Sequence, residues 1–382
     1  MKKRIMALFL AAAVMAAGLM GCKSNSNSNE TAELEESTEA PAEETEEPKE
    51  AAVNVDTTEA SANNTWKPEK DPSEYKICCY WPAPDTFFDS YVLEGLEAFE
   101  ADYGVDIEWV VGTEWTQDVE NQMVEAKVAE GYNLFLIFGA DTAGANALYS
   151  ELYDAGCQVV NYAGLMDEPQ KSASTLASDV YVQAYNSTKN LIELMGGEGQ
   201  IINVLEQLSD VNTQKRQQGV EDAVAEYENV SIVQTVADIS TVDQGYEKIS
   251  DALTANAGAT GIITTGGTAS QGLANALADY YGTNQNVPHI YAGSMDQSNE
   301  VMEAIAQGHI DYTVAQNGWA MGYVSSLILC MLSDGWEANE FGQFIDTGYL
   351  FIDQSNSETW QTGIEENAAN LIATLETDWF TK

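Results

Sequence analysis

Three polar side chains in the second half of the chain could together hold a small polar molecule: Arg216, Asp296 and Gln316. A carboxylate accepts two hydroxyl hydrogen bonds at once. An arginine presents a planar fork of donors that suits paired hydroxyls or a carboxylate. Two alternatives need no ligand: Arg216 could form a surface salt bridge, and Asp296 could cap the helix that follows it.

A cluster of aromatic residues offers a complementary apolar surface. The segment Trp81-Pro-Ala-Pro-Asp85-Thr-Phe87-Phe88 follows the first expected strand and holds three aromatic rings in eight positions. An aromatic ring can cover the C–H face of a sugar ring and exclude water from it. The alternative, for one of the two phenylalanines, is packing against the next helix.

Apolar patterning predicts strands that alternate with amphipathic helices, which is typical of parallel sheets with right-handed crossovers. We therefore predict an α/β protein with two doubly wound parallel-sheet lobes. In such sheets ligands sit beyond the carboxyl ends of the strands. The expected strands are 75–80, 107–111, 134–138, 159–162, 200–205, 231–236, 261–265, 289–292, a strand ending at Gln316, and 348–352.

The residues around Asp296 carry a family resemblance. The spacing Asp296–Gly308–Gln316 and the run Arg216-Gln-Gln-Gly219 resemble the ribose-binding group of type I periplasmic sugar-binding proteins of ABC importers. The resemblance implies that Asp296 binds sugar hydroxyls, that Gln316 lies at a hinge between lobes, and that Phe87 and Phe88 stack on the ligand.

The same resemblance implies a domain layout and a binding site. It predicts an N-terminal lobe from 74–178 plus 317–345 and a C-terminal lobe from 179–316 plus 346–382. A three-segment hinge is expected near 177–179, 315–317 and 343–346. The expected ligand-binding residues are Trp81, Asp85, Phe87, Phe88, Phe138, Arg216, Gly266, Asp296 and Gln316.

Several positions depart from the family pattern. Asp85 replaces an asparagine, and Phe138, Ala163 and Gly266 replace polar residues at three strand ends. Burying an unpaired hydroxyl costs roughly 1–3 kcal/mol. We therefore expect a ligand less hydroxylated than ribose, or a larger one with an apolar face, such as a deoxy sugar or a glycoside.

The N-terminal residues resemble a bacterial lipoprotein leader. A basic start and an apolar run end at Leu19-Met20-Gly21-Cys22, which predicts a signal peptide over 1–21 and a lipid on Cys22. Residues 22–73 are Glu-rich with almost no large apolar side chain, so we expect a disordered acidic tether. A transmembrane anchor and an acidic partner-binding tail are the alternatives.

Composition excludes several functions. The chain carries 15 Lys and Arg against 61 Asp and Glu, a formal net charge of −46, which disfavours nucleic acid. Five cysteines without a Cys-x-x-Cys pair and two histidines disfavour zinc, so buried free thiols are expected. The Gly-rich runs at 196–199 and 266–267 lack the spacing of nucleotide-binding loops. No catalytic arrangement or cofactor is predicted.

These observations together predict a monomeric, extracytoplasmic solute-binding lipoprotein. Its partners would be a sugar-like ligand, an ABC permease, and the membrane through the lipid on Cys22. A sensory protein that presents its ligand state to a membrane receptor is the main alternative. A soluble repressor of similar fold would need an N-terminal DNA-binding helix pair, where this chain has a leader and an acidic segment.

Overall fold

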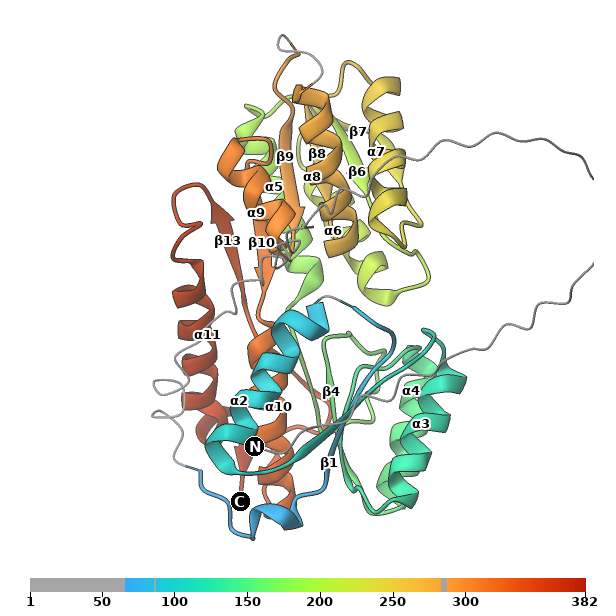
Figure 1. Ribbon diagram of the computed structural model, residues 1–382, viewed down its shortest axis with the longest axis vertical. Coiled ribbons are helices and arrows are strands. Elements are labelled where there is room, and N and C mark those ends of the chain that lie inside the picture. Colours follow the sequence, from blue (N-terminus) through green and yellow to red (C-terminus); the bar gives the residue numbers. More distant parts are fainter. Residues whose placement is uncertain (1–65, 86, 283–286) are drawn as a thin grey trace, which may run out of the picture. The chain divides into compact units, whose positions relative to one another are not determined.

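The structure is a computed structural model that describes residues 66–85, 87–282 and 287–382. The strands form two six-stranded sheets, one in each lobe, with the orders β12-β5-β4-β3-β1-β2 and β13-β10-β9-β8-β6-β7 (Figure 1). Neighbouring strands are parallel in both sheets, except that β13 runs antiparallel to β10. The predicted fold class of two parallel-sheet α/β lobes is confirmed.

The first sheet contains β1 (Ile77–Trp81), β2 (Ile107–Val111), β3 (Leu134–Ile137), β4 (Gln158–Tyr162), β5 (Ser174–Ala177) and β12 (Gln343–Asp346). The second contains β6 (Gly199–Val204), β7 (Val230–Val236), β8 (Gly261–Thr264), β9 (Tyr291–Met295), β10 (Tyr312–Gln316) and β13 (Tyr349–Asp353). A small antiparallel pair joins β11 (Glu337–Ala338) to β14 (Phe380–Thr381).

Helices connect most of these strands. The first lobe uses α2 (Leu93–Tyr103), preceded by a π-helical turn (Phe88–Val92), α3 (Gln117–Ala129), α4 (Thr142–Asp154) and α10 (Gly318–Ser333). The second uses α5 (Val180–Leu194), α6 (Val211–Ala225), α7 (Val242–Ala255), α8 (Gly267–Gly282) and α9 (Asn299–Gln307). The last α-helix is α11 (Trp360–Thr374), which a π-helical turn (Leu375–Trp379) follows.

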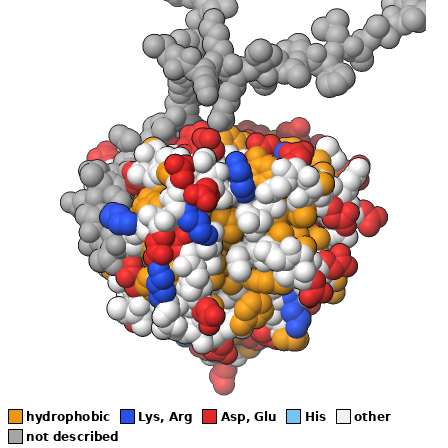
Figure 2. Space-filling view, turned by 90° about the horizontal axis from the view of Figure 1, so that it is seen from below, with side chains coloured by type: hydrophobic (Ala, Val, Ile, Leu, Met, Phe, Trp, Pro, Cys, Tyr) orange, Lys and Arg blue, Asp and Glu red, His pale blue; other side chains and the backbone are white. Residues whose placement is uncertain are grey.

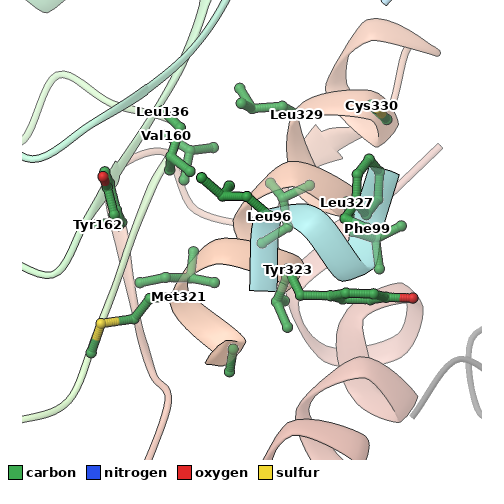
Figure 3. Close-up of a cluster of buried hydrophobic side chains, with 14 of the residues drawn as sticks. Leu96, Phe99, Leu136, Val160, Tyr162, Met321, Tyr323, Leu327, Leu329 and Cys330 are labelled. Carbon is green, nitrogen blue, oxygen red and sulfur yellow. The ribbon is translucent and has the colours of Figure 1, made fainter. Parts of the chain in front are cut away.

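Helix α10 forms the centre of the first lobe. It is apolar on all sides, so it is buried between α2 and the sheet, as Figure 3 shows for Met321, Leu327 and Cys330. Two glycines let the helices approach closely: a Cβ on Gly95 would lie 2.2 Å from the Trp319 carbonyl oxygen, and one on Gly322 would lie 2.3 Å from that of Val92. This contact holds the beginning of α10, and hence Gln316 just before it, in a fixed place.

The chain passes between the two sheets three times, after β5, after β10 and after β12. The first and third crossings are joined: Ser178 Oγ donates to the Gly348 carbonyl at 2.7 Å, and Thr347 N donates to the Ala177 carbonyl at 3.1 Å. The second crossing is fixed by Asn317, whose side chain donates to the Ile364 carbonyl at 3.1 Å. The three crossings lie at or beside the segments expected for the hinge.

The ends of the described chain correct the predicted domain layout. Trp66 is 3% exposed and lies in the core of the first lobe, so the expected tether cannot reach residue 73. Leu375 and Phe380 are in the same core, so residues 346–382 do not all belong to the second lobe. Cys22, the expected signal peptide and most of the expected tether lie outside the described residues.

Strands β5 and β9 differ from expectation, and the short strands β11 and β14 were not predicted. Strand β5 was expected only at its end, as a hinge strand near 177–179, because Ser174-Thr-Leu-Ala177 is short and half polar. Strand β9 begins later than predicted and continues to Met295, through Gly293 and Ser294, which are weak strand formers. Asp296 therefore follows its strand directly.

The surface carries the acidic excess of the sequence. Asp and Glu side chains are scattered over the face in Figure 2 with Lys or Arg between them. The four described cysteines are free and buried, as expected. Within the described residues, none of the helices combines the length and the apolarity needed to cross a membrane.

Candidate functional site

A cleft of about 340 Å³ lies between the two lobes, where the carboxyl ends of strands from both sheets face each other. Small-molecule sites have volumes of roughly 300–1,000 Å³. Of the nine predicted ligand-binding residues, all but Phe88 and Gly266 line this cleft: Trp81, Asp85, Phe87, Phe138, Arg216, Asp296 and Gln316. Sequence reasoning did not single out Tyr91, Trp115, Glu206 or Asn212, which line it as well.

Asp296 anchors the polar part of the cleft. Its backbone has φ +65°, in the left-handed region that aspartate adopts only occasionally. Strand β10 holds it there, since Asp296 N donates to the Val314 carbonyl at 2.9 Å and Thr313 Oγ1 donates to the Asp296 carbonyl at 2.7 Å. Strain of this kind persists where surrounding structure enforces it, and it clusters at functional sites.

The side chain of Asp296 is directed by Gln316, whose Nε2 donates to Asp296 Oδ1 at 2.9 Å. Ser298, not Asp296, caps α9, so the capping alternative for Asp296 is wrong. Burial raises the pKa of Asp296 to about 6, although Arg216 and the Gln316 hydrogen bond both act to lower it.

Arg216 approaches the cleft from α6. It is 7% exposed, so the alternative of a surface salt bridge is wrong. No carboxylate in the described part of the chain lies within 4 Å of its guanidinium, and Nε has no hydrogen-bond partner. A buried arginine with an unused donor is arranged to meet an acceptor from a ligand.

Glu206 is the main site residue that sequence reasoning missed. It comes two residues after β6, where the rule about strand ends would have found it. Its Oε1 accepts from Ala269 N at 3.2 Å, and burial raises the pKa of Glu206 to about 7, against the lowering effect of Arg216.

Gly266 has a different role from the one predicted. A Cβ on Gly266 would lie 2.3 Å from the Glu206 carboxyl carbon, so the glycine makes room for this side chain. At this strand end the polar group expected from the family pattern is therefore not lost. Glu206 supplies it from the neighbouring strand.

Aromatic rings form the opposite side of the cleft, on the first lobe. The Trp81 ring centroid lies 4.8 Å from that of Phe138 and 6.3 Å from that of Phe87, and Trp115 packs against Phe138 at 4.9 Å. Phe88 is 1% exposed and packs in the core, so the packing alternative holds for this one of the two phenylalanines. Asp85 stands beside the rings, half-buried, with Oδ1 accepting from Phe87 N at 2.6 Å.

Two hydrogen-bonded contacts connect the lobes at the edges of the cleft. Asn212 on α6 donates from Nδ2 to the Ala163 carbonyl at 3.2 Å and accepts from Leu165 N at 3.2 Å. Tyr91 donates its hydroxyl to the Gln297 carbonyl at 2.5 Å. Ala163 has φ +61°, so the carbonyl that Asn212 reaches is presented by a second strained residue.

Comparison with known proteins identifies the family. Residues 79–337 match the model of the periplasmic binding protein domain. The chain belongs to this family. A curated relative of this binding protein, a D-apiose import binding protein from Actinobacillus succinogenes, is 26% identical over 204 residues. That match spans 52% of the present chain and 63% of the relative.

Solved structures share the fold of this binding protein. An ABC transporter solute-binding protein from Burkholderia graminis, in complex with D-arabinose, has a TM-score of 0.70 at 18% identity and covers 76% of this chain and 99% of its own. One from Bacillus halodurans with bound myo-inositol has a TM-score of 0.68 at 16% identity, with the same two coverages. At such identities the likeness extends to the fold alone.

Proposed function

We propose that this binding protein captures a sugar or sugar-like molecule outside the cytoplasm and delivers it to an ABC importer. The observation that carries the proposal is the division of the cleft. Asp296, Gln316 and Arg216 offer acceptors and donors for hydroxyls on one side, and aromatic rings offer an apolar surface on the other. A sugar ligand is also supported by the relative that is named for D-apiose import and by the similar structure in complex with D-arabinose.

The lobes would close over the ligand by bending at the three crossings. The binding protein would act as a monomer, with the residues that line the cleft all contributed by one chain. The closed form would then be recognised by a permease in the membrane. The binding protein would release its ligand chemically unchanged, which distinguishes it from an enzyme.

A ligand panel read by thermal shift and calorimetry tests this function. Ribose, arabinose, a deoxy sugar and an aryl glycoside form the panel, with amino acids as the unrelated class. A ligand that binds only the folded state raises the melting temperature by mass action. Stabilisation by amino acids and by none of the sugars would contradict the proposal.

The aromatic side of the cleft supports a ligand with one apolar face, as the sequence predicted. A deoxy sugar or a glycoside should therefore bind more tightly than ribose. Tight binding of ribose alone would show that Glu206 and its neighbours fully satisfy a ring with hydroxyls on every edge.

We also propose that Cys22 carries a lipid that anchors the mature protein to the cell membrane. The Cys22→Ala variant should then move from the membrane fraction to the soluble fraction. Membrane retention of this variant with its leader intact would instead support a transmembrane anchor.

A sensory role is the second candidate, since a receptor could recognise the same closed form. The genes beside this one distinguish the two, because an importer needs a permease and an ATPase and a sensor needs a receptor.

A further inference from the structure

We propose that the cleft selects a sugar that carries a protonated amino group, and that Glu206 is the residue responsible for this choice. The inference rests on the proposed sugar-binding function and narrows the class of ligand. It comes from the charges that line the cleft.

Acidic side chains outnumber basic ones in the cleft. Among its described lining residues, Asp85, Glu206, Asp210 and Asp296 oppose a single cation, Arg216. Asp210 is satisfied by the N-terminus of α6, where it accepts hydrogen bonds from the backbone N–H groups of residues 212 and 213. The four carboxyl groups and the guanidinium have a formal charge of −3 when all are ionised. Both oxygens of Asp210 already accept hydrogen bonds, so the other three carboxyl groups are the ones left to meet a ligand.

The second observation is the state of Arg216. Its Nε has no partner although the residue is buried, and it makes no ion pair within 4 Å in the described structure. The guanidinium is therefore available to a ligand and is not used up by the carboxylates. An acceptor on the ligand, such as a ring or hydroxyl oxygen, would accept the hydrogen bond that Arg216 Nε can donate.

Two of the carboxylates converge on one short segment. Glu206 follows β6, and a Cβ added to Gly266 would lie 2.5 Å from Glu206 Oε1. Asp296 follows β9, and a Cβ added to Gly267 would lie 3.0 Å from Asp296 Oδ2. Both side chains therefore flank the same two adjacent glycines. An ammonium group has three donors and can reach more than one carboxylate, whereas a hydroxyl has one donor.

An organic cation fits this surrounding better than a metal ion. Within the described residues, no group of three or more His, Cys, Asp or Glu is arranged to hold a metal. Hydrogen bonds in which the donor or the acceptor is ionised are roughly twice as strong as neutral ones. The aromatic rings of the first lobe add a surface that attracts cations. An aminodeoxy sugar also has fewer hydroxyls than its parent, as expected for the ligand from the sequence.

Without a cationic ligand, protons reduce the charge of the cleft. Burial raises the pKa of Glu206 to about 7 and that of Asp296 to about 6, with Arg216 opposing both shifts and Asp85 adding to both. An ammonium group beside Glu206 would lower the pKa of Glu206 and displace the proton from its carboxyl group. Binding of an amino sugar near pH 7 should therefore release protons to the buffer, and binding of a neutral sugar should not.

Titration calorimetry at pH 7 with glucosamine, N-acetylglucosamine and glucose, and with galactosamine and galactose, tests the inference. In the glucose set, the galactose set or both, the sugar with the free amine should bind at least tenfold more tightly than the neutral sugars of the same set. Its apparent enthalpy should depend on the ionisation enthalpy of the buffer. The Glu206→Gln variant should lose both the preference and the proton release.

Two further variants serve as controls for a loss of binding that is caused by misfolding. Glu206→Asp keeps the charge and should keep the preference for the amine at lower affinity. Glu120→Gln changes another buried glutamate with a pKa raised to about 7, outside the cleft lining, and should leave the preference intact.

The outcomes separate this inference from the proposed function. Neutral sugars that bind as tightly as the amines would overturn the inference and leave sugar binding in place. Binding of none of the sugars, with a folded protein, would overturn both.

Discussion

Asp296 combines a strained backbone with a side chain aimed into the cleft, and this permits a clean test of its role. Asparagine tolerates positive φ at least as well as aspartate does. The Asp296→Asn variant therefore removes the charge without disturbing the fold. Since a hydrogen bond to a charged group contributes roughly 1.5–3 kcal/mol, sugar affinity measured by calorimetry should fall about tenfold or more.

Asp238 provides the matched control. It also has positive φ, at +56°, and follows a strand, but it is not among the residues that line the cleft. The Asp238→Asn variant should bind ligand as the unchanged protein does. Equal affinity in both variants would show that Asp296 has only a structural role.

The carboxyl groups of the cleft also predict a pH dependence of stability. Burial raises the pKa of Glu206 from an ordinary value of 4.5 to about 7, so the folded state holds this proton more tightly than the unfolded state. Unfolding free energy must then fall as pH rises from about 4.5 to about 7. At 1.36 kcal/mol per pKa unit, the upper limit is roughly 3 kcal/mol.

Chemical denaturation of the unliganded protein at several pH values measures this slope. The Glu206→Gln variant should have a smaller slope and a higher stability at pH 8 than the unchanged protein. Part of the slope should remain, because burial also raises the pKa of Glu120 to about 7. A slope unchanged by Glu206→Gln would mean that this carboxyl is not desolvated in solution.

The residues found from sequence and those missed have a physical explanation. Asp296 and Gln316 could be found from their spacing around Gly308. Arg216 could be found from the run Arg216-Gln-Gln-Gly219 near the start of a helix. Glu206 follows a predicted strand, so its position could have been found, but its role depends on the space that Gly266 leaves on a neighbouring strand, which the sequence does not reveal. Phe87 and Phe88 are adjacent, and only the direction of the chain after β1 decides which ring faces the cleft.

At the scale of elements, helix α6 carries both Arg216 and the lobe-connecting Asn212. The Asn212 side chain makes two hydrogen bonds to the backbone of the first lobe. At roughly 0.5–1.5 kcal/mol each, their loss in Asn212→Ala should favour separated lobes. We expect a larger radius of gyration by small-angle scattering without ligand and an affinity weaker by up to about 100-fold.

Asn146 on α4 offers a control for this variant. Its side chain also makes two backbone hydrogen bonds, to the Asp167 carbonyl and from Lys171 N, but both lie within the first lobe. The Asn146→Ala variant should lose stability without a change in lobe separation. A radius of gyration that is the same in both variants would show that Asn212 does not hold the lobes together.

The elements were largely predictable because their apolar patterns are strong. Strand β3 is a continuous apolar run, and α10 is apolar on all sides. Most of strand β5 was missed because its four residues are half polar, and tertiary pairing with β4 and β12 determines its conformation. Pairing also extends β9 to Met295, although Gly293 and Ser294 disfavour a strand.

At the scale of the whole molecule, sequence patterns located the lobes but not the residues at the ends that complete them. Helix α11 begins beside β13 of the second lobe and ends in the core of the first, where Leu371 and Leu375 pack. Amphipathicity predicts such a helix without saying which core receives it. Residues 22–73 resemble a tether in the sequence because they have few large apolar side chains, and Trp66 is their only aromatic residue.

Trp66 makes the boundary of the folded part testable. Its ring lies 5.3 Å from that of Tyr103, and the segment after it is fixed to α10, where Tyr75 Oη donates to Asp334 Oδ1 at 2.8 Å and Lys70 lies 3.8 Å from the same oxygen. Removing a buried Trp side chain costs roughly 3–5 kcal/mol. At about 2 °C per kcal/mol, this amounts to several degrees in melting temperature.

Three chains, beginning at residues 23, 66 and 74, compare the two possible boundaries by calorimetric melting. The first two should melt within about 1 °C of each other and bind ligand equally, because residues 23–65 have too few apolar side chains to contribute a core. The third should melt at least roughly 5 °C lower, since it lacks the packing of Trp66 and the Lys70 contact. A lower melting temperature already at the second chain would mean that part of 23–65 packs on a lobe. Equal melting of all three would mean that the contacts of Trp66 contribute no net stability.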